Sequence, residues 1–393
     1  MTNLTDIEMA TQEDVRADLR SVFLGAIRVT LESLLEEEIR SVVGAYRWQR
    51  LSGRRGYRNG SYLRSLITSM GHLDLNVPRS REHGSASEVL GRYQRRTTEI
   101  DEAITSAYVN GVSTRKMGEV TEALMGEGVS RSTVSRATKA LDEKVALLRR
   151  DPIEGPIPYL FLDATFLDAR WARKVENVAA LVAYGVGPDG HRRLLGITIG
   201  AQESEESWAE LLRQLIERGL SGVKLVIADA HAGLVAAVRH HLPEVRLQRC
   251  VVHLMRNVLV KAPWRLRARL AREVSHVFSA PSIADARKRL EQLKSGLGAQ
   301  VPEAMEMLAE GFLSATQFHA FPKAHWRRIR STNGLERLHG EVKRRIRAVG
   351  AFPDRASALR LITAVALRVT AIWSDRRYLD LSQINTEEEN RAA

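Results

Sequence analysis

The sequence has one cysteine, Cys250, among its 393 residues, so the chain cannot form an internal disulfide or a thiol-rich zinc module. Its longest apolar runs, such as residues 178–186, are far shorter than the roughly 20 residues that cross a bilayer. The opening MTNLTDIEMA has no basic stretch followed by an apolar one, as a secretory signal would. These absences predict a soluble protein of the reducing cytoplasm that has no membrane partner.

Acidic residues are also scarce relative to basic ones. Asp and Glu number 47 against 59 Lys and Arg, which gives a net charge of +12. The bases are segregated: residues 47–96 hold 11 of them with 3 acids, and residues 249–272 hold 7 with none. Residues 1–38 reverse this balance, with 9 acids and 3 arginines. The segregation favours nucleic acid as the partner, although a merely soluble basic surface would give the same net charge.

The first third of the chain reads as three segments. Residues 1–46 contain apolar side chains at helical spacing over 12–46, which predicts a helix that packs within the chain or across a dimer. Residues 47–98 are rich in Arg, Gly and Tyr and predict a short hairpin over 66–78, closed by Pro78. The candidate phosphate contacts of this basic segment are Arg54, Arg55 and Arg58.

Residues 99–150 carry a helix-turn-helix pattern. Ser113 and Ser130 stand where N-caps belong, and the glycine-bearing turn 126–128 separates the two helices. The start of a recognition helix contacts base edges, which makes this region a candidate DNA-binding domain. A plain helical hairpin has the same pattern. The candidate DNA contacts are Arg115 on the first helix and Arg131, Ser132, Ser135 and Arg136 on the second.

After a proline-bearing linker at 151–158 the periodicity changes to that of buried strands. Three consecutive strands and then alternating helices and strands predict a mixed α/β sheet with helices on both faces. The expected strands are 159–166, 178–186, 194–199, 223–228 and 245–252, with helices at 205–218 and 234–241. Strand signals then vanish, which predicts a helical segment at 257–321, further helices at 322–380 broken near 350–354, and a flexible tail at 381–393.

Three carboxylates stand out by position. Asp163 lies inside the first strand of this sheet, Asp229 ends the fourth, and Glu336 is the first acid of a strongly basic helix. A buried strand carboxylate is costly unless it meets a cation. Carboxylates so placed can hold two Mg²⁺ ions, which activate a water or a 3′-hydroxyl and stabilise the leaving oxygen. The candidate DNA contacts around this helix are Arg327, Arg328, Lys343, Arg344 and Arg345.

Each carboxylate also has an ordinary structural interpretation. Asp163 could pair with Arg170, Asp229 could be a turn residue, and Glu336 could pair with Arg337 or His339. Two further acids are expected not to be ligands. Asp168 is an odd number of positions from Asp163 and points to the opposite sheet face, and Glu341 is rotated away from Glu336 on the helix.

Cys250 and His253 form a C-x-x-H pair that is expected at the end of the fifth strand. Two ligands do not complete a zinc site, which normally needs four. The pair is therefore predicted to support or position groups near the metal ligands.

Separated motifs occur along the chain in this order: RRGYRNGSYLRSL, YVNGVSTRKMGEV, LFLDATFLDAR, VIADAHAGL, RCVVHLMRN and STNGLERLHGEVKRR. On these motifs, which follow the family's order, the chain resembles bacterial Mutator-type insertion-sequence transposases from about residue 54 to 379. The resemblance implies a ribonuclease H-like catalytic domain at 151–256 and 322–380, interrupted by a helical insertion. It matches Asp163, Asp229 and Glu336 to the family's DDE metal ligands, and Cys250 and His253 to its C-x-x-H motif. Asn333 and Arg337 match the N-x-x-E-R signature, whereas Gly334 and His339 depart from the usual residues there.

The function expected from this resemblance is a DNA transposase that binds terminal inverted repeats and target DNA as a homodimer. It would cleave and transfer strands with two Mg²⁺ ions, for which Mn²⁺ would substitute, by a copy-out route. It would act in the bacterial cytoplasm, on the nucleoid when bound to DNA. Two alternatives share parts of the pattern: an inactive, transposase-derived DNA-binding regulator, and a metal-dependent nuclease without strand transfer.

Overall fold

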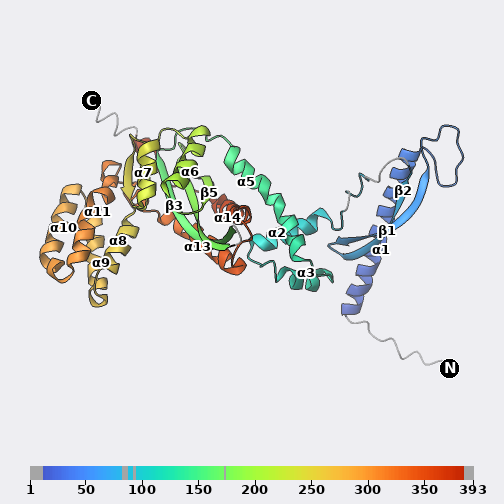
Figure 1. The fold of residues 1–393 in the computed structure, drawn as a ribbon, viewed down its shortest axis with the longest axis horizontal. Coiled ribbons are helices and arrows are strands. Elements are labelled where there is room, and N and C mark those ends of the chain that lie inside the picture. The colour runs from blue at the N-terminus through green and yellow to red at the C-terminus, as the bar shows by residue number, and fades with distance from the viewer. Residues whose placement is uncertain (1–11, 82–86, 92–93, 172–173, 385–393) are drawn as a thin grey trace, which may run out of the picture. The chain divides into compact units, whose positions relative to one another are not determined.

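The computed structural model describes residues 12–81, 87–91, 94–171 and 174–384 of the chain. It is a mixed α/β structure that divides into two compact units, Met1–Lys139 and Ala140–Ala393 (Figure 1). The start of the predicted N-terminal segment, 1–11, and most of the predicted tail, 385–393, lie outside the described residues.

The first unit begins with the helix α1 (Gln12–Val43), which packs on a hairpin of β1 (Arg58–Thr68) and β2 (Gly71–Ser80). The small core between them contains Leu35, Leu66 and Leu75. The hairpin is longer than the predicted 66–78, because the Arg- and Tyr-rich residues from Arg58 onward pair with β2. Pro78 lies within β2 opposite Ser61 rather than closing the hairpin, which a two-stranded sheet tolerates because both of its strands are edges.

Three short helices complete this unit: α2 (Thr98–Val109), α3 (Met117–Met125) and α4 (Arg131–Ala137). Gly126 ends α3 in the left-handed conformation, and the Ser130 hydroxyl caps α4 by accepting a hydrogen bond from the Thr133 amide. The 3₁₀ turn η1 (Thr138–Ala140) separates α4 from α5 (Leu141–Arg150), so the second helix of the predicted helix-turn-helix pattern, which begins after Ser130, is short and is followed by a separate helix.

The second unit is built on a five-stranded sheet in the order β5-β4-β3-β6-β7. β3, β4 and β5 are antiparallel, whereas β6 and β7 run parallel to β3. This is the predicted mixed sheet. Its strands are β3 (Tyr159–Trp171), β4 (Lys174–Val186), β5 (Arg192–Gly200), β6 (Leu225–Ala228) and β7 (Arg246–Arg249). Residues 151–158, expected as a linker, pack on the unit instead: Ile157 is buried and its amide donates to Ser221.

Helices cover both faces of the sheet (Figure 1). On one face α6 (Glu205–Glu217) and α7 (Ala232–His241) bury Leu160, Leu162 and Trp208 in the main core. On the other face lie α13 (Asn333–Val349) and α14 (Arg355–Thr370), beside the stacked rings of Phe161 and Tyr184. Arg360 of α14 makes two hydrogen bonds to Asp142, at 2.7 and 2.8 Å, which fasten α5 to this layer.

The region expected to be helical follows β7. It consists of α8 (Val251–Val260), α9 (Trp264–Phe278), α10 (Ile283–Leu297), η2 (Gly298–Gln300), α11 (Pro302–Ala315), η3 (Gln317–Ala320) and α12 (Trp326–Ile329). The last short turn is η4 (Ala371–Trp373). One stretch, Arg355–Trp373, is long and apolar enough to cross a membrane. It is nonetheless a core helix, because α14 packs against β3, β5 and α13 and buries Leu361, Ile362 and Val365.

Candidate active site

Asp163 and Asp229 come from neighbouring parallel strands of the sheet. The pairing of β3 with β6 ends at Phe161 and Ile227, and each aspartate lies two residues further along its chain. Both are thus delivered to the same edge of the sheet, where the ends of parallel strands normally present functional groups. The side chain of Asp163 is 14% exposed and that of Asp229 is 40% exposed.

Side-chain parity explains why Asp163 faces the α13 layer. Alternate residues of a strand point to opposite sheet faces, and Phe161, two residues earlier, stacks on Tyr184 of β4, whose side chain lies against Gly334 of α13. Asp168 has the opposite parity, is exposed, and accepts a hydrogen bond from Asn177 at 3.0 Å. The expectation that Asp163 and Asp168 face opposite ways therefore agrees with one continuous β3.

Glu336 lies in the first turn of α13, exposed, on the wall of a cavity of about 220 Å³. Asp163 lines the same cavity, although the two residues are 173 positions apart in sequence (336 − 163). Two cations, Arg256 and Lys343, lie on its walls as well. The cavity thus combines two carboxylates with groups that attract a phosphate. Glu341 is turned away, as expected, and pairs with Arg344 at 2.7 Å.

The C-x-x-H pair fastens the start of α13 to the sheet edge. β7 ends at Arg249, so Cys250 is the N-cap of α8 and His253 lies in the first turn of that helix rather than on a strand. The Cys250 amide donates to Ala228, and its sulfur accepts from the amide and hydroxyl of Thr332 at 3.4 and 3.5 Å. Cys250 therefore links β6, which precedes Asp229, to the residue that precedes α13.

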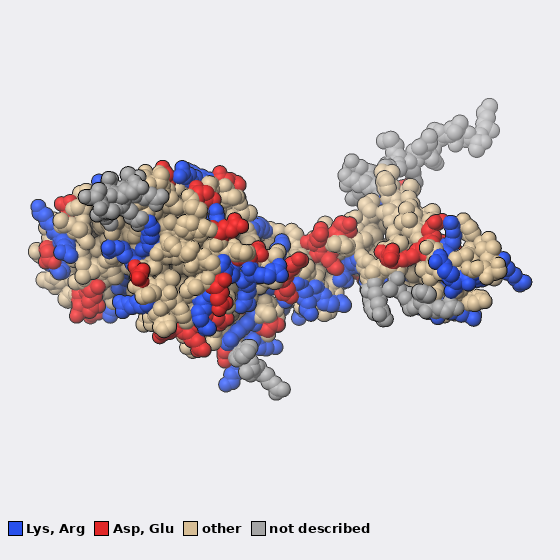
Figure 2. All heavy atoms as spheres, turned by 90° about the horizontal axis from the view of Figure 1, so that it is seen from above, with Lys and Arg blue, Asp and Glu red and all other residues tan. Residues whose placement is uncertain are grey.

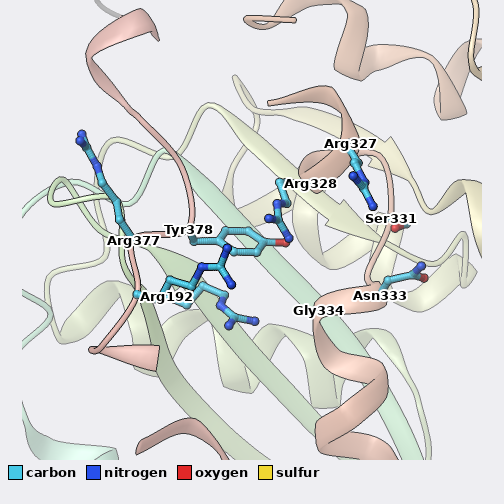
Figure 3. Close-up of a pocket in the computed structure, with 9 residues that line it drawn as sticks. Arg192, Arg327, Arg328, Ser331, Asn333, Gly334, Arg377 and Tyr378 are labelled. Carbon is cyan, nitrogen blue, oxygen red and sulfur yellow. The ribbon is translucent and has the colours of Figure 1, made fainter. Parts of the chain in front are cut away.

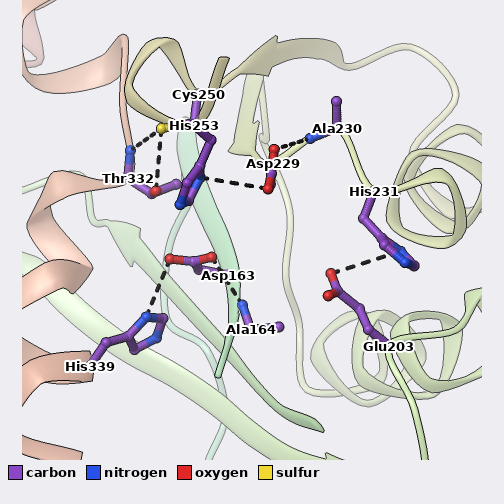
Figure 4. A network of polar contacts seen from close by, with 10 residues as sticks. All are labelled: Asp163, Ala164, Glu203, Asp229, Ala230, His231, Cys250, His253, Thr332 and His339. Atoms are coloured by element: carbon purple, nitrogen blue, oxygen red, sulfur yellow. Dashed lines mark hydrogen bonds and ion pairs between the residues drawn. The ribbon is translucent and has the colours of Figure 1, made fainter. Parts of the chain in front are cut away.

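His253 stands beside both aspartates (Figure 4). Its Nδ1 lies 3.9 Å from the Asp229 carboxylate. A hydrogen bond with the Cys250 sulfur raises the pKa of His253 to about 9, against the effect of burial, and the negative charges of Cys250, Asp229 and Asp163 add to the rise. Burial alone would raise the pKa of the Cys250 thiol, but His253 and Thr332 hold it below its ordinary value. The contacts with Cys250 and the two aspartates thus favour the protonated form of His253.

The pKa of Asp163 is raised to about 6, chiefly by burial; the His253 charge and the Ala164 amide oppose the rise, and the neighbouring carboxylates of Asp229 and Glu203 contribute to it. The protein's own groups thus only partly compensate the negative charge of the Asp163 carboxylate. Such a group favours a bound cation.

Two further groups at this edge escaped the sequence analysis as functional candidates. His339 of α13 places its Nδ1 3.4 Å from Asp163, but burial lowers its pKa to about 4, so the contact is one with a neutral imidazole. Glu203, just before α6, lies 3.8 Å from His231, and burial raises its pKa. His339 lies three residues after Glu336, one helical turn away, which is the only sequence signal that could have indicated it.

The alternative pairings do not account for the triad. The close partner of Asp163 is His339 rather than Arg170, and among the described side chains Glu336 forms no hydrogen bond or ion pair with Arg337. Asn333 lies at the start of α13 on the cavity wall, whereas Arg337 is exposed. In the described part of the chain, no three carboxylate, imidazole or thiol groups converge closely enough to enclose a metal ion as they stand.

The candidate DNA contacts differ in how available they are. Arg55 and Arg58 bind within the first unit, to the Ser41 carbonyl and to Glu36, and Arg54 covers the Tyr57 ring. Arg345 is buried, with 4% of its side chain exposed, so it is removed from the candidate DNA surface. The remaining candidates are exposed: Arg115, Arg131, Ser132, Ser135, Arg136, Arg327, Arg328, Lys343 and Arg344.

A second, larger cavity, of about 900 Å³, lies in the first unit between the hairpin and the turn before α4. Arg64, Arg79, Arg95, Arg96 and Arg136 line it. On the face shown in Figure 2 basic and acidic side chains are interspersed over each unit, so net charge alone does not trace a binding path. The basic residues that line the cavities indicate DNA contacts better than the overall surface charge does.

Comparison with known proteins identifies the family. The family model described as "Transposase, Mutator family" matches residues 1–375. The chain is 35% identical over 359 residues to the transposase for insertion sequence element ISRM5 of Rhizobium meliloti, covering 91% of this chain and 90% of the relative. It is 34% identical to the transposase for IS256 in transposon Tn4001 of Staphylococcus aureus, over 96% of both chains, and 34% identical to that for IS1081 of Mycobacterium tuberculosis, over 97% of this chain and 92% of the relative. The chain belongs to the Mutator family of transposases.

Proposed function

We propose that this protein is an insertion-sequence transposase that cleaves and joins DNA strands at a metal-dependent centre formed by Asp163, Asp229 and Glu336. The observation that carries the proposal is that Asp163 and Glu336 line one cavity and that Asp229 follows the strand next to that of Asp163. Asp163 lies within β3 just past its pairing with β6, Asp229 directly follows β6, and a glutamate from a helix more than 100 residues later lines the same cavity as Asp163. The family's relatives, named as transposases, support the same activity.

We propose a ribonuclease H-like fold for residues 151–256 and 322–380. Three antiparallel strands followed by two parallel strands on the other side of the first strand support it. Residues 257–321 would be an insertion that contacts DNA.

The donor chemistry of the triad fits Mg²⁺, which prefers carboxylate oxygen and retains several waters. Asp163 is under-compensated in charge, and the exposed Glu336 side chain is not fixed by packing. When bound, two such ions would activate a water or 3′-hydroxyl and stabilise the leaving oxygen, and Mn²⁺ would substitute. The thiol and imidazole of Cys250 and His253 do not form a zinc site with these residues.

The chain's own groups prepare this chemistry. The amides of Ala164 and Ala230 donate to Asp163 and Asp229, at 3.0 and 2.7 Å, and orient their carboxylates. The link from Cys250 to Thr332 fixes the beginning of α13 and so the position of Glu336. Arg256 and Lys343 place positive charge where a DNA phosphate would enter.

We propose that residues 47–98 and 99–150 bind the terminal inverted repeats, the second segment as a helix-turn-helix with α4 as its recognition helix. The exposed residues of α4 and the neighbouring 900 Å³ cavity of the first unit, which several arginines line, support this role. The route is expected to be copy-out, and the protein would work in the bacterial cytoplasm, on the nucleoid when bound to DNA.

We also propose that α1 forms a homodimer contact. Its face toward the hairpin is partly buried, and several apolar side chains elsewhere on it remain exposed, namely Leu19, Val22, Phe23, Val29 and Leu34. Because a transposase must handle two element ends together, a second copy is the occupant that the function requires.

The proposal is tested by cleavage of DNA that carries the element's ends, in Mg²⁺ and in Mn²⁺. Asp163→Asn, Asp229→Asn and Glu336→Gln should each abolish nicking while binding of the same DNA stays nearly unchanged. Asp168→Asn and Glu341→Gln, on neighbouring positions outside the triad, are matched controls that should remain active. An active Asp229→Asn protein would refute the assignment. Specific binding with no cleavage by the wild type would indicate a regulator.

A further inference from the structure

A second cavity of the catalytic unit, of about 330 Å³, lies at the beginning of α13 (Figure 3). Four segments that are distant in sequence form it: β5, α12, the first turn of α13, and the strip that follows η4. It is lined by five arginines, Arg192, Arg327, Arg328, Arg376 and Arg377. Among the described residues on its walls there is no acidic side chain. Like charges crowded in this way repel one another unless an anion lies between them.

Tyr378 holds two of these arginines in place. The guanidinium carbons of Arg192 and Arg328 lie 4.6 and 4.9 Å from the centre of its ring (Figure 3). Burial lowers the pKa of Arg192, and the Arg328 charge contributes to this lowering. Within the described part of the chain, the buried Nε of Arg192 has no hydrogen-bond partner. Part of its hydrogen-bonding capacity is therefore unused by the protein.

The strip that carries Arg376, Arg377 and Tyr378 is anchored to the turn between β4 and β5. The amides of Tyr378 and Leu379 both donate to the Gly190 carbonyl, at 2.8 and 3.2 Å. Gly190 has a φ of +79°, and a Cβ there would lie only 2.1 Å from the Leu379 carbonyl oxygen. Only glycine permits this close approach. Arg377 also pairs with Asp380 at 2.8 Å, so it contributes less free charge than Arg376.

Asn333 lines both this cavity and the cavity of Asp163 and Glu336. The two cavities are therefore neighbours at the first turn of α13. Guanidinium groups bind phosphate oxygens through charge-assisted and often paired hydrogen bonds. We infer that the arginine-lined cavity binds a backbone phosphate of the DNA strand whose neighbouring phosphate lies at the carboxylate centre. This inference rests on the proposed function and adds a strand-positioning site to it.

The test measures binding of a labelled single-stranded oligonucleotide with the sequence of the element's end, by fluorescence anisotropy over a range of salt. EDTA is present, so that no chemistry contributes. The variant is Arg327→Ala combined with Arg376→Ala, two exposed side chains from different walls. The matched control is Arg213→Ala combined with Arg239→Ala, exposed arginines of α6 and α7 that remove the same charge away from the cavity.

The cavity variant should lose roughly tenfold or more in affinity, and the slope of log K against log salt should become shallower by about 0.7, because one neutralised phosphate of a single strand contributes about 0.7. The control should change neither value by as much. Equal changes in the two double variants would overturn the inference. Competition by inorganic phosphate or a nucleoside triphosphate, with strand affinity unchanged in the cavity variant, would also overturn it, because the cavity would then hold a free anion.

Failure here is distinguishable from failure of the proposed function, which is read by cleavage with the wild type. Unchanged salt slopes together with metal-dependent cleavage would remove only the phosphate site. A changed slope in a wild-type protein that never cleaves would keep the phosphate site and remove the catalytic assignment.

Discussion

Gly334→Ala should move the helix that carries Glu336. A Cβ at position 334 would lie 2.5 Å from the hydroxyl oxygen of Tyr184, closer than real contacts allow, and Tyr184 is fully buried on β4, an interior strand of the sheet. The next atoms, the Tyr184 Cζ at 3.4 Å and the Tyr378 hydroxyl at 3.6 Å, would be ordinary neighbours. The strain therefore comes from one oxygen atom.

The magnitude follows from two opposing effects. Alanine is favoured over glycine in a helix by about 0.5–1 kcal/mol, whereas forcing an extra methyl into a packed site costs about 1–3 kcal/mol. Gly334→Ala should thus lower the free energy of unfolding by about 1 kcal/mol and reduce strand cleavage by displacing Glu336. In a Tyr184→Phe background the clash is absent, and the same change should stabilise the protein by about 0.5–1 kcal/mol.

The assay is a double-mutant cycle of urea unfolding, with strand cleavage measured in parallel. We expect a coupling of about 1–3 kcal/mol between the two positions and partial rescue of cleavage in the double variant. Gly340→Ala is the control, because a Cβ at this position of the same helix meets nothing within 4 Å and should stabilise the protein. Additive effects of Gly334→Ala and Tyr184→Phe would refute the packing argument.

Three further predictions concern other parts of the chain. The folded-state pKa of Asp163, about 6, lies above its unfolded value, so its contribution to stability is full below about pH 4 and is lost as pH rises through 6. Between pH 4 and pH 7, the free energy of unfolding of Asp163→Asn should therefore rise by on the order of 2–3 kcal/mol relative to that of the wild type, measured by urea unfolding without metal. Parallel pH curves of the two proteins would contradict this. Arg360→Ala should lower the free energy of unfolding by about 1–2 kcal/mol, because it removes the two charge-assisted hydrogen bonds between α14 and α5. Asp142→Ala should cost more, because it leaves the buried Arg360 guanidinium unpaired; equal stability of Arg360→Ala and wild type would show that the pair does not hold α5. Val22→Asp on α1 should shift a dimer toward monomer in sedimentation, while Val260→Asp, equally exposed on α8, should not; a dimer unaffected by Val22→Asp would move the contact elsewhere.

The succession of strands along the second unit was predictable because buried strands leave continuous apolar runs and the turns between them contain Gly, Pro and Asp. The parity of Asp163 and Asp168 followed from strand geometry alone. The full length of the hairpin was not predictable, because the residues after Arg58 are polar and become a strand only by pairing with β2. The end of β7 at Arg249 is likewise set by the Cys250 contact with Thr332, 82 positions later.

Roles that depend on tertiary packing could not be predicted from the sequence pattern. Gly334 weakens helix propensity in sequence, and the reason for a glycine there is Tyr184, on a strand 150 positions earlier. The arginine-lined cavity draws on four segments, which no local spacing connects. Arg345 was predictable in principle, because it follows Leu338 and Val342 at helical spacing and shares their buried face.

The central claim is that the triad transfers strands as well as cutting them. The most direct measurement is the appearance of covalently joined DNA products from substrates carrying the element's ends, with Mg²⁺ or Mn²⁺, for wild type and Glu336→Gln. Joined products from the wild type that disappear in the variant are the expected result. Nicked DNA without joined products from the wild type, or joined products from Glu336→Gln, would contradict the account.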